Sequence, residues 1–182
     1  MLEAVLLVFS AGVLTRIADM AADDGLKLSR YTGYATGALY GFLIAYAITH
    51  YPLLAELGIA VIAAVLITSK IDHPVHAAGL ATAIIFFTVY GIGPLSVPLL
   101  AFFMISGALD ELGNNLSDSG RIHGLISRFF KYRLTMELAA FSVSCLTGNW
   151  MVFLAMVSYD AGFTYAFPAS FRTKLIRLSR QR

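Results

Sequence analysis

The sequence LTMELAAFSVSCLTGNWMVFLAMVSYDAGFTYAF, residues 134–167, decides how the chain folds. These 34 residues are almost all apolar, whereas one helix across a bilayer needs only about 20. The segment is therefore too long for one ordinary span. Thr147-Gly148-Asn149 lies near its middle and is typical of a turn. We predict two helices here, over 134–146 and 150–167.

The composition of the whole chain indicates lipid as its solvent. Hydrophobic residues make up 58% of the 182 residues, charged residues 13%, and the mean hydropathy is +0.75. Soluble domains carry about a quarter charged residues. The chain has room for six or seven spans of about 20 residues each and almost none for a soluble domain. The single cysteine, Cys145, excludes a disulfide framework and a cysteine-based metal site, and we expect no nucleic-acid partner.

Short polar breaks divide the rest of the chain into further apolar stretches. Residues 2–18 are not a good signal peptide, because no basic segment precedes them and acidic residues follow them. An amphipathic piece, 122–132, is expected on the membrane surface. Gly33, Gly37 and Gly41 repeat every four positions, which suits close helix packing in lipid but also arises by chance. The other predicted spans are 2–18, 31–54, 57–69, 77–90 and 95–109.

The basic residues orient these spans. All 13 Lys and Arg residues follow the first, third, fifth or seventh span, and the turns after the other spans have none. The positive-inside rule places such loops in the cytosol, and six spans would put the basic tail on the wrong side. The predicted fold is therefore all-α, a polytopic integral membrane helix bundle of seven transmembrane helices with its N-terminus outside and its C-terminus inside. Residues 1–168 form the transmembrane domain, 169–182 form a basic cytosolic tail, and the expected location is the plasma membrane.

In this arrangement the acidic residues gather at the cytosolic ends of four spans. Three of the ends have the form Asp-x-x-x-(Asp/His/Asn), and a helix would turn both members of such a pair the same way. Carboxylate oxygens suit Mg²⁺, and a histidine ligand also tolerates Mn²⁺ or Zn²⁺. The predicted metal ligands are Asp19, Asp23, Asp72, His76, Asp110, Glu111, Asn114 and Asp160. The predicted catalytic residues are Asp19, Asp72, Asp110 and Asp160, with Arg16, Lys70 and Arg133 as substrate-binding residues.

A simpler interpretation is that these acids are solvated or paired with their basic neighbours. Carboxylates are disfavoured at helix C-termini, where the helix dipole is negative, so such acids need a positive partner. A bound metal supplies one, and so do Arg16, Lys70 or Arg133. Glu137 is expected to pair with Arg133 one turn away.

The Asp19/Asp23 pair and, less closely, Asp110/Asn114 resemble the metal-diphosphate motifs of membrane prenyltransferases of the UbiA type. The resemblance is confined to these positions. The chain is shorter than members of that family, lacks the Asn before the first motif and has no second Asp-x-x-x-Asp. The resemblance implies metal-assisted chemistry on a lipid diphosphate.

Three functions remain open from the sequence. The first is a metal-dependent enzyme, a transferase or hydrolase, acting on a prenyl- or phospholipid-type phosphate or diphosphate. The second is a transporter or channel for divalent cations or protons, although the centres of the spans are almost wholly apolar. The third is a non-catalytic membrane scaffold. Membrane lipids are the expected partners, and a homo-oligomer is compatible with each function.

Overall fold

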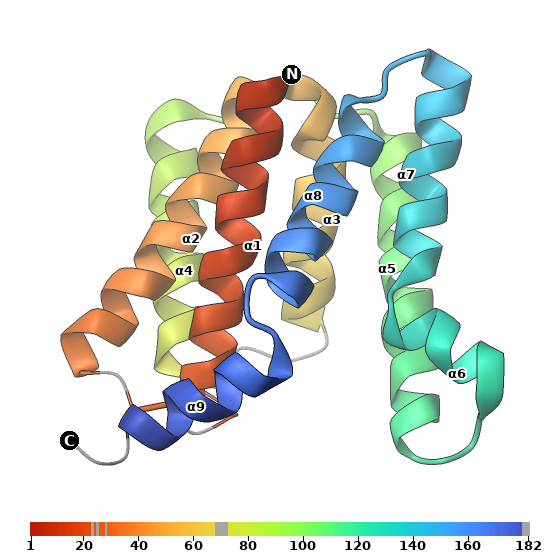
Figure 1. The fold of residues 1–182 in the computed structure, drawn as a ribbon. Helices are drawn as coiled ribbons and strands as arrows, with labels where there is room; N and C mark the ends of the chain where they lie inside the picture. The colour runs from red at the N-terminus through yellow and green to blue at the C-terminus, as the bar shows by residue number, and fades with distance from the viewer. Residues whose placement is uncertain (23, 25, 28, 68–72, 180–182) are drawn as a thin grey trace.

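A computed structural model describes residues 1–22, 24, 26, 27, 29–67 and 73–179. These residues contain helices and no strand, which confirms the all-α fold. Figure 1 shows the helices side by side, with α6 and α9 at one end of the bundle. The elements are α1 (Leu2–Ala22), α2 (Arg30–His50), the 3₁₀ turn η1 (Pro52–Leu54), α3 (Ala55–Ile67), α4 (Pro74–Tyr90), α5 (Val97–Asp118), α6 (Gly124–Lys131), α7 (Leu134–Thr147), α8 (Met151–Tyr165) and α9 (Ala169–Ser179).

The long apolar segment divides where its composition predicts. Helix α7 ends at Thr147 and α8 begins at Met151. Gly148 lies between them with φ 68°, a left-handed conformation that a glycine adopts without a steric penalty at the end of a helix. Asn149 Oδ1 then accepts the backbone N–H of Met151 at 3.1 Å. The turn therefore has a local physical cause.

The long helices alternate in direction along the chain. Helices α1, α3, α5 and α8 run downward in Figure 1, and α2, α4 and α7 run upward. The C-terminal ends of α1 and α8 therefore lie at the same end of the bundle. This is the arrangement that a common site for Asp19 and Asp160 requires.

Glycines bring two pairs of helices into close contact. A Cβ atom on Gly37 or Gly41 of α2 would collide with the carbonyl oxygens of Val75 and Gly79 in α4. The same holds between α1 and α8, where Gly12 contacts the backbone of Tyr159 and Gly162 contacts that of Phe9. The regular glycine spacing in α2 thus marks a packing face, as small residues do in helix pairs within lipid.

Few of the described helices are long enough to cross a bilayer. Among the described residues, α1 alone is long and apolar enough to cross a bilayer. A second candidate arises if the bent pair Tyr31–His50 and Pro52–Ala64, with an angle of 116°, counts as one span. Helices α3, α4, α7 and α8 have 13, 17, 14 and 15 residues, and 17 residues extend only ~25 Å at 1.5 Å each. One or two candidate spans are weak evidence for a membrane location, and the seven-span bundle is not confirmed.

The predicted surface piece forms helix α6, which is strongly amphipathic. Leu125 and Ile126 are exposed by 81% and 60%, and Arg128 and Lys131 occupy the last turn.

At the same end of the bundle, the Ser179 hydroxyl of α9 accepts the backbone N–H of Lys27 at 3.1 Å. This contact holds the C-terminal helix against the connection between α1 and α2.

Candidate functional site

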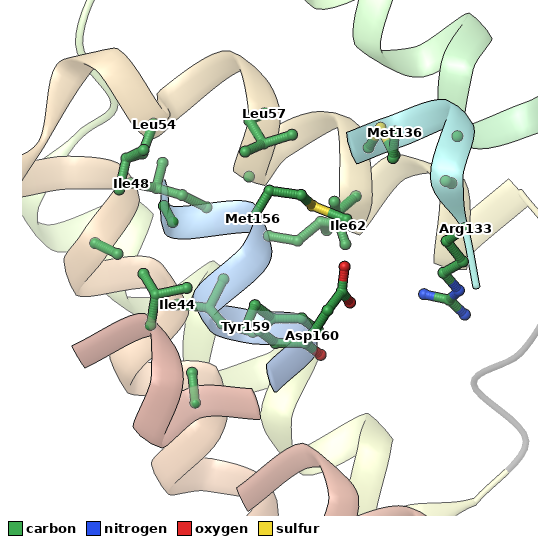
Figure 2. A pocket seen from close by; sticks show the side chains of 18 of the residues that line it. Ile44, Ile48, Leu54, Leu57, Ile62, Arg133, Met136, Met156, Tyr159 and Asp160 are labelled. Carbon is green, nitrogen blue, oxygen red and sulfur yellow. The ribbon is translucent and has the colours of Figure 1, made fainter. Parts of the chain in front are cut away.

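A cavity of about 140 Å³ lies between α1, α2, α3 and α8, with α5 and α7 at one end. Most of its wall is aliphatic, formed by residues such as Ile44, Ile48 and Ile62. Figure 2 shows Leu54 and Ile48 at one end and Asp160 and Arg133 at the other. The polar end is lined by Asp110, Glu111, Arg133, Tyr159 and Asp160. The cavity is therefore amphipathic along its length.

Asp110 joins two helices at the polar end. Its side chain extends from α5 and is 3% exposed. Oδ1 accepts the backbone N–H of Thr135 at 3.1 Å, and Oδ2 accepts that of Met136 at 2.8 Å. The first N–H groups of a helix lack partners within the helix, and a carboxylate there also faces the positive end of the dipole. Asp110 therefore caps α7, and both of its oxygens are occupied.

Arg133 lies at the start of α7 in an unusual backbone conformation. Its φ of 53° and ψ of 36° are left-handed, the one positive φ among the described non-glycine residues. This conformation costs roughly 1–2 kcal/mol for a residue with a Cβ. The tight connection after α6 imposes it, since the N–H of Arg133 bonds to the carbonyl of Phe130 at 3.0 Å. The guanidinium group interacts electrostatically with Asp110 and Asp160.

Asp160 extends from α8 into the same polar end (Figure 2). Its Oδ2 atom is buried, and no N–H or O–H group of the described residues donates to it. The carboxyl group of Glu137 lies close enough to that of Asp160 for the two to interact electrostatically. Glu137 thus pairs with an acid of α8 in addition to lying one turn from Arg133.

Three ionisable groups form a second polar set beside the cavity. His76 Nε2 lies 3.3 Å from Asp19 Oδ1, and His76 Nδ1 lies 3.1 Å from the Tyr40 hydroxyl. The three residues belong to α4, α1 and α2. Tyr159 links this set to the cavity, because it interacts electrostatically with Asp19 on one side and with Asp160 and Arg133 on the other.

The sequence-predicted site residues are thus only partly brought together. Asp110, Glu111, Arg133 and Asp160 line one cavity, while Asp19 and His76 pair with each other next to it. Arg16 forms an ion pair with Asp24 at 2.8 Å and lies over the Phe163 ring. The Asn114 amide donates to Asp118 at 3.3 Å. Asp23, Lys70 and Asp72 lie outside the described residues, so their predicted roles stay predictions.

The described residues contain no group of three or more His, Cys, Asp or Glu side chains placed to hold a metal ion. Mg²⁺ does not require such a cage, because it is commonly bound by one or two carboxylates together with water and substrate phosphate oxygens. Asp160, with a buried oxygen that receives no N–H or O–H bond from the described residues, fits this kind of partial site.

Sequence reasoning missed three residues of this region. The sequence predicts no site role for Tyr40 and Tyr159, and it predicts Glu137 as a partner of Arg133. The adjacency of Tyr159 to Asp160 was the available signal for one of them. The contacts of Tyr40 and Glu137 join different helices, and spacing along one helix cannot show such contacts.

Comparison of the chain with known protein families, with curated proteins and with solved structures finds no match. The function must therefore be argued from the site alone.

Proposed function

We propose that the protein is a membrane-embedded enzyme that acts on the phosphate or diphosphate of a lipid, with Mg²⁺ as its cofactor. The observation that carries the proposal is the amphipathic cavity, which joins an aliphatic wall to a charged end containing Arg133 and Asp160. A lipid phosphate likewise consists of an apolar chain and a charged head group.

The proposed setting is a bilayer crossed seven times, with the N-terminus outside and the C-terminus in the cytosol of a cell whose plasma membrane holds the protein. Two features support this. Large aliphatic side chains face outward on several helices, with Ile85 and Ile105 exposed by 64% and 62%, and such surfaces are disfavoured in water. The basic residues also follow helices whose ends lie at one end of the bundle, as they do in cytosolic loops. The short helices then require local thinning of the bilayer.

The size of the cavity limits how much of the lipid it holds. A cavity of about 150 Å³ accommodates a benzene-sized group, and this one measures about 140 Å³. The first part of a hydrocarbon chain fits without movement of the walls, and the rest extends toward the surrounding lipid. The head then lies beside Asp160, Arg133 and Tyr159.

Charge explains why a cation is part of the proposal. The polar end has three acidic side chains, Asp110, Glu111 and Asp160, and one basic side chain, Arg133. An anionic phosphate would be repelled there unless a cation came with it. Asp160 would hold Mg²⁺, whose positive charge would offset this repulsion, and Arg133 would neutralise a phosphate oxygen. Both groups would stabilise negative charge that develops on the leaving group.

Thermal unfolding of the purified protein tests this proposal. A prenyl diphosphate analogue should raise the midpoint in the presence of Mg²⁺ and have little effect with EDTA, since a ligand that binds only the folded state stabilises it. Asp160→Asn should abolish the response. Asp118→Asn is the matched control, because Asp118 is an exposed acid outside the cavity. If the analogue raised the unfolding midpoint equally in EDTA, or raised the midpoint of Asp160→Asn as much as that of the unmodified protein, the assigned site would be wrong.

A further inference from the structure

A second apolar recess lies beside α7 and α8. This groove, of about 350 Å³, runs between α6, α7 and α8. Its walls are aromatic and aliphatic, and Glu137 is the one polar side chain that lines it. The lining residues are Phe129, Leu134, Glu137, Leu138, Phe141 and Phe153.

The walls of the groove are arranged by packing between aromatic rings. Phe141 of α7 meets Phe153 of α8 edge to face, with ring centroids 5.3 Å apart, and Trp150 lies against Phe141 at 5.8 Å. Such contacts fix ring orientation. Leu138 and Phe141 are nevertheless 54% and 41% exposed, so the groove is open to the surroundings of the bundle. Rigid aromatic walls with an open side suit a hydrocarbon chain that enters from lipid.

Glu137 joins the groove to the cavity. Its side chain lines the groove, and its carboxyl group interacts electrostatically with that of Asp160, which lines the cavity. The two recesses therefore approach each other at one carboxyl pair. A ligand in each recess would place its polar end at that pair.

We propose that the groove binds a second lipid, a neutral one whose hydroxyl group hydrogen bonds to Glu137. The chain chemistry follows from the six lining side chains, of which five are hydrocarbon. The head chemistry follows from the single carboxyl group, which repels a phosphate and accepts a hydrogen bond from a hydroxyl. This inference rests on the proposed function and extends it, because it gives the enzyme a second substrate site, as a transferase needs and a hydrolase does not.

Photolabelling of the purified full-length protein tests the proposal. The probe is a long-chain alcohol with a photoreactive group in its chain, and the labelled peptides are identified by mass spectrometry. Labels are expected on the α7 and α8 walls of the groove. Glu137→Gln keeps the shape of the side chain and removes its charge, and it should lower labelling roughly tenfold, the effect of losing a hydrogen bond to a charged group.

A pair of variants on one helix separates the groove from the general lipid surface. Leu138→Trp fills the groove and should abolish labelling there. Leu146→Trp is the control, since Leu146 is 87% exposed on the same helix and does not line the groove. Equal labelling by a matching alkane without a hydroxyl, or by a long-chain amine alone, would overturn the proposal.

Thermal stabilisation by the prenyl diphosphate analogue distinguishes the failure of this inference from the failure of the proposed function. Leu138→Trp should leave the Mg²⁺-dependent stabilisation by the prenyl diphosphate analogue unchanged. If that stabilisation is present while the alcohol fails to label the groove, the second site is refuted and the proposed function stands. If the stabilisation is absent from the unmodified protein, the proposed function fails, and this inference loses its basis.

Discussion

The carboxylate of Asp110 accepts the backbone N–H of Met136 at 2.8 Å, although 26 positions separate the two residues. This bond and its neighbour to Thr135 fix where α7 begins relative to α5. Because Arg133 and Glu137 lie in the first turn of α7 or just before it, the same bonds determine their positions against Asp160. Asp110, which the sequence predicts to bind a metal, therefore stabilises the start of α7. Only the structure shows this role.

The first prediction concerns this cap. Asp110→Asn should lower the free energy of unfolding by about 1–2 kcal/mol, because an amide accepts only through its oxygen and turns an N–H group toward the other helix donor. Chemical unfolding in detergent measures the change. Asp118→Asn, in an exposed pair with Lys131, should change stability by less than about 0.5 kcal/mol. Equal effects of the two variants would contradict the capping role.

The second prediction concerns the contact between α2 and α4. Gly41→Ala places a methyl group against the carbonyl oxygen of Gly79, so the helices must separate, at a cost of about 1–3 kcal/mol. Gly93→Ala is the control, since a Cβ there meets no atom within 4 Å. The unfolding transition of each variant gives the comparison. Similar stability of Gly41→Ala and Gly93→Ala would show that the helices are less close than described.

The sequence predicts the helices well because their causes are local. Apolar length, the Thr147-Gly148-Asn149 turn and the amphipathic pattern of 122–132 each act within one segment. Most of the predicted stretches match a described helix to within a few residues, but the one over 31–54 is broken after His50. The end of α5 is less well predicted. The expected span stops at 109, yet the helix continues to Asp118, because polar residues end an apolar stretch without ending a helix.

The site is predicted less completely because it depends on contacts between segments. Spacing placed Asp19 and Asp110 in one acidic cluster, whereas the fold gives the first a histidine partner and the second two backbone N–H partners. Glu56 shows the same effect. Its side chain is buried and accepts the backbone N–H of Ser96 at 2.8 Å, at the start of α5. Long-range capping leaves no periodic pattern in a sequence.

The third prediction concerns the proposed orientation. In a Cys145→Ser background, Gly93→Cys and Ser119→Cys place single thiols at exposed positions in the connection before α5 and just after α5, at opposite ends of that helix. A membrane-impermeant maleimide should label Gly93→Cys in intact cells, and Ser119→Cys only after permeabilisation. The opposite result would reverse the orientation, and labelling of both sites in intact cells would exclude a bilayer crossing between them.

The fourth prediction separates the backbone of Arg133 from its side chain. Arg133→Ala and Arg133→Gly both remove the guanidinium group, but only glycine adopts φ 53° without a steric penalty. Arg133→Gly should therefore be more stable than Arg133→Ala by about 1 kcal/mol. Both variants should lose most of the stabilisation by a prenyl diphosphate analogue with Mg²⁺, since neither can neutralise the phosphate. If Arg133→Gly kept the full response to the lipid, the arginine would serve only the connection between α6 and α7, and the polar end of the cavity would need another cation to hold a phosphate.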